Sequence, residues 1–254
     1  MNDLSQWQGK TALVTGASSG IGADAAEALA QAGMRVAVCA RRTERLNDLV
    51  ERLVGQGIVV QSFTCDLRVA SQISHLFTAI RAQWGGVDVL INSAGVGFKQ
   101  PLMTGDTDAW RTMLDVNVLA LSLCTREAVS DMRRRGDRGH VVHVSSMSGH
   151  RIVSSGGGFY AATKFAVRAL TEGLRRELRA AGSQIRVSAL SPAVVETEFA
   201  SVYHGDDTAG AAESYRRFTV LQPRDVTQAM CYVLGAPEHA EVHDVLIRGT
   251  QQPS

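Results

Sequence analysis

The sequence predicts an α/β protein built on a doubly wound, seven-stranded parallel sheet with helices on both faces. Short runs rich in Val, Leu and Ile alternate with longer amphipathic segments along the 254-residue chain. These runs are apolar almost throughout, which is typical of strands buried on both faces and not of strands with one solvated face. Strands and helices that alternate in this order form right-handed βαβ units.

The expected strands follow the apolar runs, at residues 11–15, 35–39, 59–65, 87–92, 140–145, 186–190 and 245–248. The expected helices lie between them, at residues 20–32, 43–55, 69–84, 107–134, 157–181 and 223–234. In the second of these helices, Leu46, Leu49, Val50 and Leu53 follow the i, i+3, i+4, i+7 spacing of one apolar face.

The whole chain, 1–254, is expected to form a single domain, because no repeat, low-complexity tract or Pro- or Gly-rich linker divides it. One region breaks the alternation of strands and helices. Residues 197–222 are long and mixed in composition, and they follow the carboxyl end of a strand. An insertion there is often a lid, so we expect a substrate loop, with a surface excursion of no function as the alternative.

Composition excludes several classes of protein. Lys plus Arg number 26 and Asp plus Glu 25, a net charge of +1 that argues against nucleic-acid binding through bulk charge. No apolar stretch reaches the ~18–20 residues of a membrane span, and the polar start gives no signal peptide. The four cysteines lie far apart without a C-x-x-C pair, which favours reduced thiols in the cytoplasm. We expect no metal site.

A glycine-rich turn follows the first strand. Gly16, Gly20 and Gly22 lie between that strand and the next helix. Glycines at this turn allow the backbone to approach a diphosphate, and the helix N-terminus offers free N–H groups to the anion. Residues 16–20 also match the G-x-S-x-G pattern of hydrolases, but that pattern leaves Gly22 unexplained and normally follows several earlier strands.

The end of the second strand indicates the cofactor. Dinucleotide folds that bind NAD place an acidic residue there, on the ribose 2′-hydroxyl. This strand ends in Ala40, and Arg41 and Arg42 follow. Guanidinium groups can hold a 2′-phosphate through paired, charged hydrogen bonds, so the sequence favours NADP(H) over NAD(H).

Tyr160 and Lys164 share one face of an expected helix, because they are four residues apart. A nearby ammonium lowers the pKa of a phenol, so the pair is a candidate acid–base unit for an alcohol and carbonyl couple. The strand upstream ends in Ser145 and Ser146, where a hydroxyl can bond a substrate oxygen. A half-buried aromatic beside an extended lysine is the alternative.

Together these residues resemble the short-chain dehydrogenase/reductase family in its single-domain branch, which has a Rossmann fold. The resemblance rests on six motifs in the family's order. They are 15–22 for the cofactor turn, 65–67 for an acidic position at the adenine, 92–95 for N-N-A-G, 115–118 around Asn117, 146–164 for Ser, Tyr and Lys, and 192–197 for P-G-x-x-x-T. Ser93 and Ala193 depart from the family's Asn and Gly at their positions.

The resemblance implies a role for each matching residue. The catalytic group is Asn117, Ser146, Tyr160 and Lys164, in which Asn117 would hold a water that feeds protons to Lys164. The cofactor residues are Gly16, Ser18, Ser19, Gly20, Ile21, Gly22, Arg41, Arg42, Asp66, Leu67, Asn92, Ala94, Gly95, Tyr160, Lys164, Pro192, Val195 and Thr197. The substrate residues are Ser146, His150, Tyr160, Phe199 and Tyr203. Homo-oligomers, tetramers or dimers packed through the helices that hold Asn117 and Tyr160, are typical of the family.

Further runs at 117–127, 146–151, 170–175 and 194–200 are similar to a subgroup with NADP-dependent ketosteroid reductases, the animal dehydrogenase/reductase member 11 proteins and insect farnesol dehydrogenase-like proteins. The expected function is NADP(H)-dependent interconversion of a carbonyl and an alcohol, on a lipophilic, steroid- or terpenoid-like small molecule. A 3-oxoacyl-type ketoacid reductase, a sugar-nucleotide epimerase and a non-catalytic NADP sensor are the alternatives.

Overall fold

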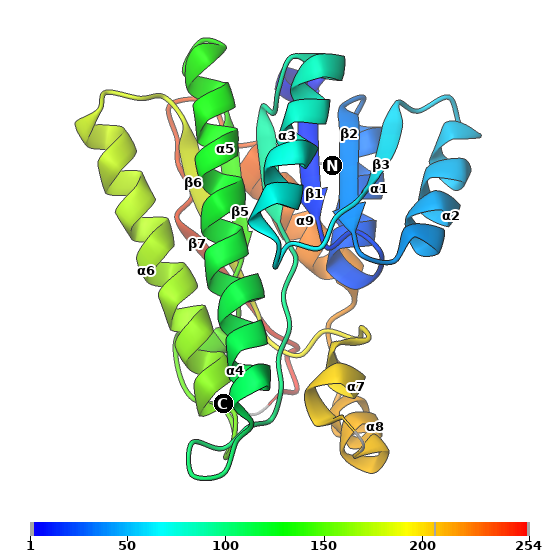
Figure 1. Cartoon of the computed structure of the whole chain (residues 1–254), viewed down its shortest axis with the longest axis vertical. Helices are drawn as coiled ribbons and strands as arrows, with labels where there is room; N and C mark the ends of the chain where they lie inside the picture. Colours follow the sequence, from blue (N-terminus) through cyan, green and yellow to red (C-terminus); the bar gives the residue numbers. More distant parts are fainter. Residues whose placement is uncertain (1–2, 206, 253–254) are drawn as a thin grey trace.

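A seven-stranded parallel sheet forms the centre of the computed structural model, which describes residues 3–205 and 207–252 (Figure 1). The spatial order of the strands is β3-β2-β1-β4-β5-β6-β7. Their bounds are β1 Thr11–Thr15, β2 Arg35–Ala40, β3 Val60–Thr64, β4 Val89–Asn92, β5 His140–Val144, β6 Arg186–Pro192 and β7 Asp244–Ile247. The expected doubly wound Rossmann fold is therefore confirmed.

Helices cover both faces of the sheet. The main ones are α1 Gly20–Gln31, α2 Thr43–Val54, α3 Ala70–Trp84, α4 Thr107–Leu114, α5 Leu121–Arg134, α6 Gly158–Ala180 and α9 Pro223–Leu234. Helices α1, α2 and α9 pack on one face, and α3, α5 and α6 pack on the other. No helix among the described residues is long and apolar enough to cross a membrane.

Burial on both faces explains why the strands carry so few polar residues. All five residues of β1 are buried. Ala12 and Val14 belong to the apolar cluster beneath α1 and α9, whereas Leu13, between them, belongs to the cluster beneath α3 and α5. Successive side chains of a strand point to opposite faces, so a strand covered on both sides needs apolar residues at every position.

The expected helix at 107–134 is interrupted where Asn117 lies. A π-helical segment, Asp115–Ala120, joins α4 to α5. The apolar spacing of the sequence is nearly the same for a helix with or without one wider turn, so periodicity did not reveal it. Such π segments are rare and occur frequently at functional sites.

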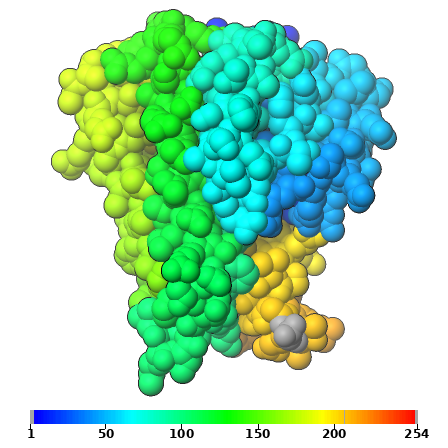
Figure 2. Space-filling view, in the orientation of Figure 1, coloured from blue at the N-terminus to red at the C-terminus, as the bar shows by residue number. Residues whose placement is uncertain are grey.

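The expected insertion at 197–222 is helical over much of its length. It contains two short helices, α7 Phe199–His204 and α8 Thr208–Arg216. Its two ends are paired, because Glu196 N donates to Leu221 O at 2.8 Å and Leu221 N donates to Val194 O at 3.1 Å. In Figure 1 these helices lie below the sheet, in yellow to orange. In the space-filling view of Figure 2, the same yellow to orange region borders the green part of the chain.

Candidate active site

The turn between β1 and α1 has no room for side chains at its three glycines. Gly16 has φ +71°, and a Cβ atom there would lie 2.7 Å from the Ala94 Cα. Gly20 has φ +55°, and a Cβ atom would lie 2.9 Å from the Thr197 Cγ2. A Cβ atom on Gly22 would lie 2.5 Å from the Gly16 carbonyl oxygen. The turn thus lets the backbone pass close to a ligand at the N-terminus of α1.

Thr15 fixes the neighbouring 92–95 segment against this turn. Its Oγ1 accepts hydrogen bonds from the backbone N–H groups of Ser93 and Ala94, both at 3.1 Å. Sequence reasoning assigned the glycines but not this threonine, whose hydroxyl joins the turn to the end of β4. The segment's backbone is held although Ser93 replaces the family's asparagine.

Arg42 lies over the turn and bonds both of its serines. Its Nη2 donates to the Ser18 Oγ at 2.9 Å and to the Ser19 Oγ at 2.8 Å. The remaining amino group, Nη1, donates to the Glu198 carboxylate at 2.7 Å. A guanidinium and two hydroxyls therefore meet beside the glycine-rich turn, with a carboxylate already bound to them.

Tyr160 and Lys164 lie on one face of α6, as their spacing predicts, and the Lys164 Nζ is 5.9 Å from the centre of the Tyr160 ring. Lys164 is only 5% exposed, and its Nζ donates to the Val144 carbonyl oxygen at 2.9 Å. Ser146 follows β5, and its hydroxyl lies close enough to the Tyr160 hydroxyl to lower the pKa of that phenol. Phenol, serine hydroxyl and amine thus gather at the carboxyl ends of the central strands.

Burial dominates the pKa values of this pair. It raises the pKa of Tyr160 well above its usual range, and the hydrogen bond from Ser146 offsets only part of that increase. Burial lowers the pKa of Lys164 to about 8, because no carboxylate compensates for the buried ammonium. Burial outweighs the lowering of the Tyr160 pKa that was expected from Lys164. The phenol stays protonated near neutral pH and can act as an acid.

Asn117 is almost fully buried, and its side chain holds the backbone of Val96. The Oδ1 accepts from Val96 N at 2.8 Å, and the Nδ2 donates to Val96 O at 2.8 Å. The second Nδ2 hydrogen reaches the Thr163 Oγ1 at 3.0 Å. Both amide hydrogens are thereby used, so this side chain positions the loop beside Lys164. That Asn117 holds a water for Lys164 stays a prediction.

Two aromatic residues of the insertion pack over Tyr160. The ring centres of Tyr160 and Phe199 are 5.3 Å apart, and those of Tyr160 and Tyr203 are 6.1 Å apart. Gly97 makes room for them, because a Cβ atom there would lie 2.5 Å from the Phe199 Cζ. The sequence did not single out this glycine. The insertion thus encloses the phenol in an aromatic cluster.

A family profile described as short chain dehydrogenase matches residues 10–207. The chain belongs to the short-chain dehydrogenase/reductase family.

Curated relatives and solved structures of this family match nearly the full chain. Dehydrogenase/reductase SDR family member 11 of Gallus gallus is 46% identical, and the match covers 99% of this chain and 100% of the relative. Farnesol dehydrogenase of Aedes aegypti is 38% identical, and the match covers 96% of this chain and 98% of that protein. The closed form of serine dehydrogenase complexed with NADP+ has a TM-score of 0.90, 30% identity and 96% coverage of both chains. The protein is an NADP-dependent oxidoreductase of this family.

The side chains of Asn92 and Asp66, two of the residues expected at the cofactor, both have protein partners. The Asn92 Nδ2 donates to the buried Thr125 Oγ1 at 3.0 Å, so the side chain ties β4 to α5. The Asp66 carboxylate accepts three side-chain hydrogen bonds from Arg68, at 2.6–3.1 Å, and these hydrogen bonds lower the pKa of Asp66. Arg41 lowers that pKa further, which places its charge near Asp66.

His150 does not join the aromatic cluster that was expected to bind substrate. Its Nε2 lies 3.1 Å from both the Ser191 Oγ and the Asp244 Oδ2, at the end of β6 and the start of β7. Ser145 also turns inward, since its buried hydroxyl donates to the Lys164 carbonyl oxygen at 3.5 Å. Among the two serines, Ser146 is therefore the one beside the phenol.

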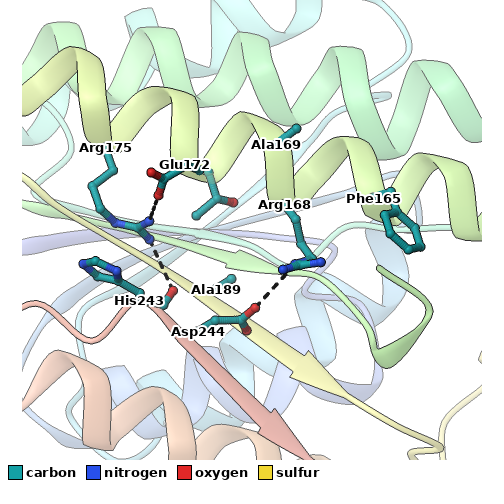
Figure 3. Close-up of a pocket in the computed structure, with 9 residues that line it drawn as sticks. Phe165, Arg168, Ala169, Glu172, Arg175, Ala189, His243 and Asp244 are labelled. Atoms are coloured by element: carbon teal, nitrogen blue, oxygen red, sulfur yellow. Dashed lines mark hydrogen bonds and ion pairs between the residues drawn. The ribbon is translucent and has the colours of Figure 1, made fainter. Parts of the chain in front are cut away.

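The cavity drawn in Figure 3 lies away from the Tyr160 hydroxyl. It measures about 530 Å³ and lies between one face of α6 and the end of the sheet at β6 and β7. Two ion pairs line it: Arg175 is bonded to Glu172 on the same helix, and Arg168 of α6 lies 3.8 Å from Asp244 of β7. Because Tyr160, Ser146 and the glycine-rich turn do not line it, we do not assign it to the reaction.

Proposed function

We propose that this oxidoreductase interconverts a carbonyl and an alcohol, on a lipophilic ketone, aldehyde or secondary alcohol of steroid or terpenoid type. The observation that carries the proposal is the enclosure of the Tyr160 phenol by Phe199 and Tyr203, at 5.3 and 6.1 Å between ring centres, beside Ser146. A proton donor set in an aromatic wall suits an apolar substrate with a single polar group to be reduced.

The proposed mechanism assigns one task to each residue. NADPH, when bound, supplies the hydride. Tyr160 donates its phenolic proton to the carbonyl oxygen, and Ser146 donates a hydrogen bond to the same oxygen and stabilises the charge that develops there. Lys164 binds a ribose hydroxyl of the cofactor, and Asn117 keeps the 96–97 backbone in place beside it. The raised pKa of Tyr160 supports the role of acid in the direction of reduction.

Residues around the glycine-rich turn fit the phosphates of NADP. We assign the diphosphate to the turn at Gly16, Gly20 and Gly22, where side chains would collide with backbone or with Thr197. We assign the 2′-phosphate to Arg42 with Ser18 and Ser19, whose donors meet at one point. Guanidinium and hydroxyl donors are the groups that bind phosphate in proteins.

Exposed apolar side chains near the aromatic cluster support a lipophilic substrate. The segment 97–103 joins α7, because Lys99 N donates to the Tyr203 carbonyl oxygen at 3.0 Å. On this segment Leu102 is 71% exposed and Met103 is 94% exposed. The name of the insect relative, farnesol dehydrogenase, also indicates a terpenoid alcohol for that protein.

A panel of ketosteroids, terpenoid aldehydes, diketones and short ketoacids, with NADPH and NADH in separate assays, tests this function. We expect the highest kcat/KM for a ketosteroid or terpenoid aldehyde with NADPH. Phe199→Ser should lower kcat/KM for these substrates more than for small diketones, whereas Tyr232→Ser, at an exposed aromatic residue of α9, should not. A preference for short ketoacids would instead support the ketoacid reductase. NADPH binding without turnover of any carbonyl would refute the proposal.

We also propose a homo-oligomer, tetramer or dimer, in a reducing compartment such as the cytoplasm. Apolar side chains stand exposed on the helical segments that hold Asn117 and Tyr160, namely Leu114, Leu119, Phe165 and Leu170. The four cysteines are free, which supports a reducing compartment. Light scattering should give a multiple of the 27.2 kDa chain, and Phe165→Glu should lower that mass. A monomeric native chain would refute the oligomer.

A further inference from the structure

The carboxylate of Glu198 lies among the groups assigned to the 2′-phosphate. Glu198 immediately precedes α7, the first helix of the insertion. Its Oε2 accepts from the Arg42 Nη1 at 2.7 Å, and its Oε1 is bonded to the Arg45 Nη1. The same Arg42 guanidinium bonds Ser18 and Ser19. An anionic group of the chain itself is therefore held where an anion of the cofactor is expected.

The neighbouring residue covers the glycine-rich turn. The Thr197 Cγ2 lies 2.9 Å from the position of a Cβ atom on Gly20, so the beginning of the insertion rests on the N-terminus of α1. On the other side of the cluster, Ser18 and Arg45 line an open cavity of about 230 Å³, together with Asp48 and Arg52 of α2. Space for a further anion is thus adjacent to Arg45.

The contacts of Glu198 are of a kind that a phosphate can replace. The side chains of Glu198 and Arg42 are both 44% exposed and that of Arg45 is 47% exposed, and ion pairs so exposed contribute little to stability. The hydrogen bonds from Arg45 and Arg42 lower the pKa of Glu198 to about 2, so it is an anion at any working pH. A phosphate monoester offers more charge and more acceptor oxygens to the same donors.

We propose that Glu198 is an internal counter-ion in the 2′-phosphate site, that NADP(H) displaces it, and that this displacement releases the beginning of the substrate loop. Arg45 is then a second ligand of the phosphate, beside Arg42. The inference rests on the proposed function in one respect, the assignment of the 2′-phosphate to Arg42, Ser18 and Ser19. It adds a link between recognition of the cofactor and the residues that enclose Tyr160.

Binding of 2′,5′-ADP and of 5′-AMP, measured by calorimetry on the full chain, tests the competition. Glu198→Gln should bind 2′,5′-ADP about three- to tenfold more tightly than the native chain does, as expected when one or two exposed ion pairs no longer compete. Its affinity for 5′-AMP, which differs from 2′,5′-ADP only by lacking the 2′-phosphate, should change less than twofold. Glu213→Gln removes the same charge from α8, where Glu213 lies 4.0 Å from Arg217, and should leave both affinities unchanged.

Hydrogen exchange of the backbone amides at 199–216 measures whether the substrate loop is released. We expect 2′,5′-ADP, but not 5′-AMP, to increase exchange there in the native chain, and Glu198→Gln to exchange rapidly without a ligand. Unchanged or weaker 2′,5′-ADP binding by Glu198→Gln, or protection of 199–216 by 2′,5′-ADP, would overturn the role of Glu198 alone. A native chain that binds both probes equally would overturn the phosphate assignment and this inference together, while the carbonyl chemistry would still be judged by turnover.

Discussion

Replacing Lys164 should make the protein more stable. Lys164 is 5% exposed and burial lowers its pKa from the ordinary 10.5 to about 8, a difference that corresponds to about 3 kcal/mol. Lys164→Met removes that penalty, but it leaves the Val144 carbonyl oxygen without the 2.9 Å bond, which costs about 1–2 kcal/mol. At pH 7 the variant should therefore gain about 1–2 kcal/mol, or about 2–6 °C in Tm.

The sign of the pH dependence follows from proton binding. The pKa of Lys164 is lower in the folded chain, so between about pH 8 and 10.5 the unfolded chain binds more protons than the folded chain does. Stability therefore rises with pH across that window, and the penalty is complete below it. The advantage of Lys164→Met should be largest near pH 7 and should disappear by pH 10.

Urea unfolding of the native chain and of Lys164→Met, at pH 7 and pH 10 without cofactor, measures this gap. Lys99→Met serves as the control, because Lys99 is exposed and the same exchange there should give a gap independent of pH. A Lys164→Met variant that is less stable than the native chain at pH 7, or a gap that does not shrink with pH, would refute the reasoning from burial.

The remaining predictions concern the reaction and the turn. Tyr160→Phe should lower turnover by about two to four orders of magnitude while NADPH binding, followed by fluorescence, changes little; undiminished turnover would contradict the acid–base role. Alcohol oxidation by the native enzyme should speed up toward alkaline pH more than carbonyl reduction does, because the raised pKa of Tyr160 leaves little phenolate; parallel profiles would argue against it. Gly22→Ala places a Cβ atom 2.5 Å from a carbonyl oxygen and should cost about 1–3 kcal/mol in a thermal melt, an effect that an unchanged Tm would rule out. Asn117→Ala should release the Val96 backbone, lowering kcat without abolishing the fold, as circular dichroism would verify.

Residue types and spacing were enough to predict the sheet, the glycine-rich turn and the face shared by Tyr160 and Lys164. These features are local, or they follow from burial on both faces of each strand, which requires an apolar residue at almost every position. The same reasoning did not give the directions of side chains. The amide of Asn92 ties β4 to α5, and His150 bonds Asp244, a residue more than ninety positions away.

By itself, the sequence determined the fold, the family and the set of groups available for chemistry. The tertiary structure decided which of those groups meet. It packs Phe199 and Tyr203 against Tyr160 and hydrogen-bonds the Asn117 side chain to the Val96 backbone. It also pairs Glu198 with two arginines that lie more than 150 positions earlier in the chain. The physical reason is that a hydrogen bond or an aromatic contact between distant residues depends on how helices and loops pack, and neither periodicity nor spacing records that packing.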